Sequence, residues 1–133
     1  MKIYIAGPIQ GYELKQGYRL RLQKFLSKLG HTIHDPWETE GMKNLFANVD
    51  FETAQDLVRR RLREVDACDA LLAYFPKDSV GTAIEAMHAK RRGKLVILIC
   101  PMKKPSPWII AISRHFYKSI DEFERDAKAL LQR

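Results

Sequence analysis

The sequence has few cysteines, no long apolar run and none of the common nucleotide-binding motifs. Its two cysteines, Cys68 and Cys100, lie far apart and outside any C-x-x-C pair, which favours buried thiols over a disulfide framework. The longest apolar runs, ALLAYF and LVILIC, have the length of strands and are too short to span a bilayer. The motifs G-x-G-x-x-G and G-K-[ST] are absent, which argues against hydride transfer and NTP hydrolysis.

Acidic residues are outnumbered, because the chain of 133 residues has 23 Lys and Arg against 16 Asp and Glu, a formal charge of +7. Such an excess attracts polyanions, and phosphate is the first candidate. Nucleic acid is disfavoured as a partner because no helix-turn-helix, zinc finger or aromatic-rich RNA motif accompanies the charge. The four histidines lack zinc-type spacing, so we expect no metal. A strand-like segment directly after Met1, in place of a leader, makes us expect a cytoplasmic protein with no membrane partner.

Strand-like and helix-like segments alternate along the chain. Strand patterns recur at 2–7, 31–35, 70–75, 94–100 and 115–119, and helical patterns at 14–29, 51–65, 82–92, 109–112 and 120–131. This alternation predicts an α/β fold, a single doubly wound domain over 1–133 with a five-stranded, mainly parallel sheet and helices on both faces. Residues 36–48 show no clear period, so we expect a loop there.

Three segments should converge beyond the carboxyl ends of the strands, where open α/β sheets bind ligands. They are YIAGPIQG at 4–11, the corner at 35–37, and PKDSVGTAIE at 76–85. Glycines let backbone amides approach a ligand closely, and hydroxyls at a helix N-terminus add further donors for an anion. The candidate binding residues in these segments are Gly7, Ile9, Gly11, Asp35, Trp37, Ser79, Gly81 and Thr82.

Glu85 has two interpretations. With Thr82 it fits a capping box, in which a Thr caps a helix and a Glu three residues later reaches back to the cap amide. It also follows an apolar strand and a glycine turn, at the edge of the sheet where ligands bind. A carboxylate beside a phosphate-sized nest suits chemistry at a sugar carbon, which it can attack and hold covalently.

The segments YIAGPIQG and CDALLAYFPKDSVGTAIEAMHA, with the apolar strand after them, resemble the nucleoside 2-deoxyribosyltransferase family, which includes the 2'-deoxynucleoside 5'-phosphate N-hydrolases. The resemblance covers most of the chain and favours the catalytic interpretation of Glu85. It implies a flavodoxin-like fold, no cofactor and cleavage of an N-glycosidic bond. It also implies a small-molecule nucleotide or nucleoside as ligand, and a homodimer or higher homo-oligomer with sites near the interface.

The resemblance implies roles for single residues. Glu85 matches the nucleophile that attacks the anomeric carbon, and Tyr4 matches the tyrosine that positions it. Ser79 stands where the phosphohydrolase branch has a phosphate-binding serine and the free-nucleoside transferases have an aspartate. Ser106 resembles a serine lent by a neighbouring subunit to the same phosphate.

Each of these matches has a structural alternative. Tyr4 could be a core residue with a satisfied hydroxyl, and Ser79 and Ser106 could be turn residues. Trp37 and Phe46 could stack on a base, or could pack near the end of the sheet.

Arg61 departs from the family's pattern. The family usually has an aspartate at this position, which is thought to help protonate the departing base, and a guanidinium cannot be that acid. Arg61 could bind the phosphate, or lie with its neighbours on a charged, solvent-facing side of a helix. Other carboxyl groups could then supply the proton, namely Asp35, Glu38 or Glu64.

The leading prediction is a hydrolase that cleaves the N-glycosidic bond of a (deoxy)nucleoside 5'-monophosphate through a covalent glycosyl-Glu intermediate. Base exchange on free nucleosides is the alternative within the family. A non-catalytic nucleotide sensor is the alternative of another class, because doubly wound sheets host many functions and Arg61 replaces the expected acid.

Overall fold

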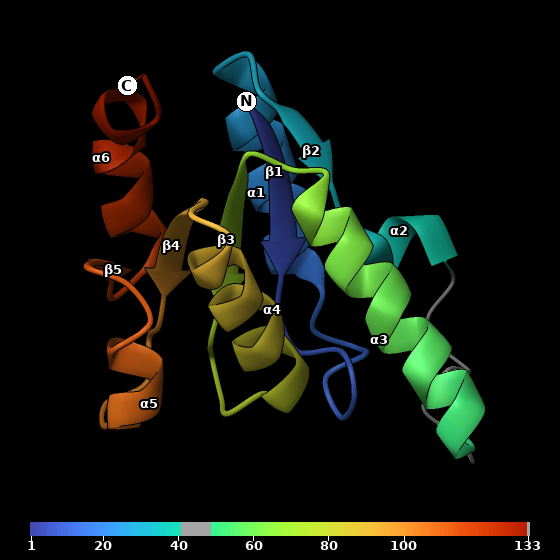
Figure 1. Cartoon of the computed structure of the whole chain (residues 1–133). Helices are drawn as coiled ribbons and strands as arrows, with labels where there is room; N and C mark the ends of the chain where they lie inside the picture. Colours follow the sequence, from blue (N-terminus) through green and yellow to red (C-terminus); the bar gives the residue numbers. More distant parts are fainter. Residues whose placement is uncertain (41–48, 133) are drawn as a thin grey trace.

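The computed structural model describes residues 1–40 and 49–132, apart from the side chains of residues 39 and 40. It contains a five-stranded sheet in the order β2-β1-β3-β4-β5, and every neighbouring pair of strands is parallel (Figure 1). This order is that of a flavodoxin-like doubly wound sheet, so the predicted fold class is confirmed. The strands are β1 (Lys2–Ala6), β2 (Thr32–His34), β3 (Ala70–Tyr74), β4 (Leu95–Ile99) and β5 (His115–Tyr117).

Helices connect the strands and cover both faces of the sheet (Figure 1). Among the described residues, no helix has the length and apolar character needed to cross a membrane. The helices are α1 (Gly17–Lys28), α2 (Pro36–Glu40), α3 (Phe51–Asp66), α4 (Val80–Arg91), α5 (Pro107–Ile110) and α6 (Ile120–Leu131).

Alternate residues of β1 point into two separate hydrophobic cores, as the period of two in a strand requires. Ile3 and Ile5 pack with apolar side chains of α1 and α6. Tyr4 and Ala6 pack on the opposite face, with side chains of α3, α4 and α5. All four side chains are almost fully buried, which accounts for the continuous apolar character of this central strand. Cys68 and Cys100 are both buried free thiols, as expected.

The structure corrects the prediction of a loop from residue 36, because Pro36–Glu40 forms the short helix α2. The local sequence explains it: the Asp35 carboxylate accepts a hydrogen bond from the Trp37 amide at 3.0 Å, and Pro36 occupies the first helical position. Phe46 lies outside the described residues. The first helix begins at Gly17, three residues later than expected from the pattern at 14–29.

The capping-box interpretation of Glu85 is wrong. Helix α4 begins at Val80, and its cap is Ser79, whose hydroxyl accepts a hydrogen bond from the Thr82 amide at 3.4 Å. Thr82 is therefore inside the first turn, where its hydroxyl lies 2.7 Å from that of Ser79. Glu85 falls in the second turn, too far along the helix to reach back to the cap amide.

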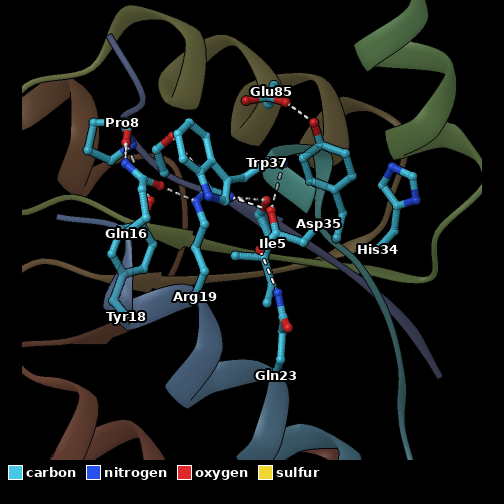
Figure 2. A network of polar contacts seen from close by, with 12 residues as sticks. Ile5, Pro8, Gln16, Tyr18, Arg19, Gln23, His34, Asp35, Trp37 and Glu85 are labelled. Atoms are coloured by element: carbon cyan, nitrogen blue, oxygen red, sulfur yellow. Dashed lines mark hydrogen bonds and ion pairs between the residues drawn. The ribbon is translucent and has the colours of Figure 1, made fainter. Parts of the chain in front are cut away.

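A buried ion pair joins α1 to the carboxyl ends of β1 and β2. Arg19 is 2% exposed, and its Nη1 lies 2.7 Å from Oδ1 of Asp35 (Figure 2). The same guanidinium donates to the backbone carbonyls of Ile5 at 3.4 Å and Gly7 at 2.9 Å. Gln23 donates to the second oxygen of Asp35 at 2.8 Å. Arg19 therefore fixes the path of the chain as it leaves β1.

We expect Asp35→Ala to lower the free energy of unfolding by about 3–5 kcal/mol, because it leaves the buried Arg19 charge uncompensated. The matched control is Asp121→Ala, which breaks an ion pair between α6 and Arg21 whose side chains are 71% and 46% exposed. That variant should lose no more than about 1 kcal/mol. Urea denaturation measures both values, and equal losses would contradict the structural role given to Asp35.

Candidate active site

A cavity of about 400 Å³ opens beyond the carboxyl ends of β1 and β3. Its wall is formed by the loop after β1, one face of α3, and the turn that leads into α4. The three segments expected to converge here each contribute residues to the cavity, the corner at 35–37 only through Pro36. The predicted site residues that line the cavity are Gly7, Ile9, Arg61, Ser79, Gly81, Thr82 and Glu85.

Five other predicted residues are not among the described residues that line this cavity, and one of them, Tyr4, lies directly behind Glu85, as described below. Asp35 is held in the ion pair with Arg19. Trp37 lies at the start of α2, where its amide donates a hydrogen bond to the Asp35 carboxylate. Gly11 turns the loop after β1 with a φ of 75°, a left-handed conformation that favours glycine. Ser106 caps α5, where its hydroxyl accepts from the Trp108 amide at 3.2 Å.

Glu85 and Tyr4 form a hydrogen-bonded pair at the cavity. The Tyr4 hydroxyl donates to a carboxylate oxygen of Glu85. Tyr4 is fully buried on β1, and its ring stacks on that of His34 with 5.6 Å between centroids and 21° between planes. The rigid strand and the stacked ring hold the hydroxyl, and the hydroxyl in turn fixes one oxygen of Glu85.

Burial dominates the ionisation of this pair. Removal from water raises the pKa of Glu85 to about 7, although the Tyr4 hydrogen bond and the nearby cations of Arg61 and Arg19 lower it in part. Burial and the adjacent Glu85 charge raise the pKa of Tyr4 far above its ordinary range. At neutral pH the tyrosine is therefore always a donor, while the carboxyl group is poised between its two forms.

Arg61 faces the cavity from α3, so the alternative of a solvent-facing position is wrong. It is 7% exposed, and its Nη1 contacts the two carboxylate oxygens of Glu64 at 3.2 and 3.3 Å. Glu64 also contacts Nε2 of His34 at 2.9 Å. The ring of His34 is the one that stacks on Tyr4, so Arg61 and Glu64 form an outer layer behind the Glu85–Tyr4 pair.

The start of α4 brings groups that bind anions to the cavity, beside the exposed carboxylate of Asp78. The dipole and amides of a helix N-terminus favour an anion, and Ser79 adds its hydroxyl there. Lys77 also lines this part, with its ammonium 3.4 Å from the carbonyl oxygen of Gln10. Hydroxyl, amides and ammonium together suit a phosphate group better than a neutral ligand.

Gly7 has a packing role that the sequence did not indicate. A Cβ at this position would lie 2.0 Å from the Tyr18 hydroxyl oxygen, so no other residue fits without moving that ring. Tyr18 itself packs against Tyr74 with 4.4 Å between centroids. The absence of a side chain at Gly7 is therefore required by α1, independently of any ligand.

Sequence reasoning missed Arg19 and Lys77 as cavity residues. Arg19 does carry a signal, because it lies beside Tyr18 and three residues before Leu22, within the buried stripe of α1. Lys77 carries none beyond its place in the turn after β3. Among the described residues, no group of three or more His, Cys, Asp or Glu side chains could hold a metal ion.

Residues 1–103 match the family model described as nucleoside 2-deoxyribosyltransferase like, so the chain belongs to this family. No curated protein matched the chain in a sequence search. A flavodoxin-like sheet with a carboxylate at the cavity beyond its strands is consistent with this assignment.

Solved structures of similar proteins include enzymes that act on nucleosides and nucleotides. The 2-deoxyribosyltransferase of Bacillus psychrosaccharolyticus is 25% identical, with a TM-score of 0.70 over 93% of this chain and 90% of its own. The CMP N-glycosidase of Clostridium botulinum is 18% identical, with a TM-score of 0.63 over 97% of this chain and 99% of its own. The 2-deoxyribosyltransferase of Leishmania mexicana is 15% identical, with a TM-score of 0.59 over 93% and 97%. The last two likenesses show the fold alone.

The raised pKa of Glu85 makes a prediction about stability. An acid whose folded-state pKa rises from 4.5 to about 7 destabilises the fold as the pH climbs through that window, because only the unfolded chain ionises freely there. We expect the stability gain of Glu85→Gln over the wild type to grow by about 2–3 kcal/mol from pH 5 to pH 8. Denaturant unfolding at both pH values measures it, with the exposed Glu52→Gln as control. An equal pH dependence in the two variants would contradict the burial of Glu85.

Proposed function

We propose that the protein is a hydrolase of nucleoside 5'-monophosphates that cleaves the N-glycosidic bond through a covalent intermediate on Glu85. The observation that carries the proposal is Glu85, held by the buried Tyr4 hydroxyl, in a cavity that also contains the start of a helix suited to bind an anion. The family assignment supports chemistry on a nucleoside or nucleotide. The CMP N-glycosidase among the structural neighbours shows that this fold supports hydrolysis of a nucleotide.

The proposed reaction has two displacements at the anomeric carbon. A carboxylate oxygen of Glu85 forms a bond to C1' while the bond between C1' and the base nitrogen breaks, and the base leaves with the electron pair. Water then attacks C1', which releases the sugar phosphate and restores the carboxylate. Tyr4 holds the reacting carboxylate in one orientation throughout, because its hydroxyl stays protonated over the working pH range.

The phosphate is proposed to bind at the start of α4. At Ser79 this chain resembles the phosphohydrolase branch, which has a phosphate-binding serine there. Ser79 lies about 1.7 helical turns before Glu85. That separation is of the order of 9 Å, which suits a sugar between the phosphate and the nucleophile. Lys77 adds a cation on the same side of the cavity.

A homo-oligomer with shared sites stays part of the proposal. Large apolar side chains are exposed on α4 and α5, where Val80 is 79%, Ile84 50% and Trp108 86% exposed. Val80 and Ile84 also line the cavity, so a second subunit placed on them would help to close it. Ser106 caps α5 beside Trp108 and reaches a phosphate only across such an interface.

The first experiment identifies the products. Wild-type protein is incubated with a mixture of nucleoside 5'-monophosphates and free nucleosides, with and without an added acceptor base, and the products are separated by chromatography. We expect free base and sugar phosphate from the monophosphates, with kcat/KM rising with pH through about 7 as Glu85 ionises. Glu85→Gln should lose at least about 10³-fold in turnover, and the exposed Glu52→Gln should lose none.

The other outcomes of this assay decide between the alternatives. New nucleosides formed only with the acceptor base would assign the protein to base exchange. A ligand that raises the melting temperature without any release of base would assign it to the non-catalytic sensors.

The phosphate site gives a second, independent prediction. Wild-type kcat/KM should be higher for monophosphates than for the matching nucleosides, and Ser79→Asp should reduce this ratio by about 10-fold or more through like-charge repulsion. Ser119→Asp is the matched control, because Ser119 caps α6 through the same contact, with the Glu122 amide. Aspartate is also a good helix cap, so both variants should fold. No phosphate preference in the wild type would refute the site.

A further inference from the structure

The cavity offers Glu85 as a nucleophile but no second carboxylic acid suited to protonate a departing base. Among the described residues, the acids that line it are Glu85 and Asp78, and Asp78 is exposed to solvent. Glu40 is the one acid whose side chain lies outside the described part of the chain, and the segment 41–48 contains no Asp, Glu or His in its sequence. The described residues therefore direct attention to a group other than a carboxylic acid as the one that stabilises a base leaving with the electron pair of its glycosidic bond.

The three carboxyl groups expected to supply the proton are not placed at this cavity. Asp35 is paired with Arg19 in the buried ion pair. Glu64 accepts hydrogen bonds behind the cavity wall, where Arg61 is one donor. Glu38 is exposed on α2 and lines a different hollow. None of the three is among the described residues that line the cavity with Glu85.

Arg61 is a charged group that lines the cavity, where none of these three carboxyl groups lies. It is 7% exposed and lies close enough to Glu85 and Tyr4 for its charge to act on the ionisation of both. Its Nη1 is held by Glu64, which sets the orientation of the guanidinium plane. Because a guanidinium carries five N–H groups, this ion pair is compatible with a second contact to a ligand. A guanidinium gives up no proton, but it binds anionic oxygen and nitrogen strongly.

We propose, on the basis of the function proposed above, that Arg61 stabilises the departing base as an anion, and that the preferred substrates carry a base of the uracil type. In the first displacement the bond between Glu85 and C1' forms as the C1'–N1 bond breaks. The electron pair passes to N1 and the ring carbonyl oxygens, where the Arg61 N–H groups donate. The base takes its proton from water after it has left.

This assignment ranks the bases by the stability of their anions. Uracil spreads the charge over two carbonyl groups, and the fluorine of 5-fluorouracil withdraws more of it. Cytosine has one carbonyl group, and adenine has none and needs a proton on a ring nitrogen to leave. The expected order of turnover is therefore 5-fluorouracil, uracil, cytosine and adenine.

The test compares kcat and KM for the 5'-monophosphates of these four bases and for the matching nucleosides, with ribose and with deoxyribose, in the wild type and in Arg61→Met, Arg61→Lys and Arg59→Met. We expect Arg61→Met to lose about 10²–10³-fold on the uracil nucleotide, as when a preorganised donor to a developing anion is removed. The loss on the 5-fluorouracil nucleotide should be smaller, since its anion needs less help. Arg61→Lys should fall between, and Arg59→Met should match the wild type because Arg59 is an exposed residue of the same helix.

A purely structural role for Arg61 would lower turnover by the same factor on all four bases, and that result would overturn the assignment. A rise in KM for monophosphates but not for nucleosides would place Arg61 at the phosphate, which would also overturn it. Circular dichroism checks the fold, and Arg61→Lys keeps the test valid if the methionine variant fails to fold. Release of adenine as fast as uracil by the wild type would refute this inference and leave the proposed hydrolase standing, whereas no release from any nucleotide would refute both.

Discussion

The buried Arg19–Asp35 ion pair is the interaction on which the geometry of the cavity depends. It joins α1 to the end of β2. The Arg19 guanidinium also donates hydrogen bonds to the carbonyls of Ile5 and Gly7, which fixes the direction of the chain after β1. A charge this deeply buried is tolerated because the Asp35 carboxylate, the Gln16 side chain and two backbone carbonyls all pair with it. The loop after β1, which forms one wall of the cavity, is thus positioned by contacts beneath it rather than by its own sequence.

A second constraint is the desolvation of Glu85, which lowers the free energy of unfolding when this carboxyl group is ionised. Burial raises its pKa to about 7, so the fold is under electrostatic strain whenever the carboxylate is ionised. The Tyr4 hydroxyl and two arginines offset part of that cost. A residue that only packed a helix against a sheet would gain nothing from such an arrangement, whereas a nucleophile gains reactivity from weak solvation.

The sequence predicted the elements whose signals are local. The apolar runs of β1, β3 and β4 and the alternating helices were sufficient for the fold, because each pattern is contained within one segment. The start of α4 was misplaced at Thr82 because two hydroxyl residues three positions apart both fit a cap, and only the structure shows that Ser79 is used. Helix α2 was overlooked although Asp35 and Pro36 are a good start signal, since a helix of five residues has no period to detect.

The side chains that shape the cavity were harder to predict because their partners are distant in sequence. The position of Arg19 within the buried stripe of α1 is a local signal of burial, but its partner Asp35 lies on another element and is met only after the fold forms. Glu85 was a candidate from its place after a strand and a glycine turn, whereas Tyr4 was proposed through a resemblance, and the hydrogen bond between them spans 81 positions. For Arg61, helical spacing left both faces open, and burial beside Val65 decides the matter.

The charge at position 61 has consequences for the whole mechanism. An acidic side chain this close to Glu85 would repel its carboxylate and raise the pKa of Glu85 further, whereas the Arg61 cation lowers it. Glu64 then prevents the cation from being an uncompensated buried charge. In the proposed mechanism this single change of charge therefore favours an ionised Glu85 and also removes a source of protons. Such a cavity suits a substrate whose base needs little assistance to leave, which links the charge on α3 to the choice of base.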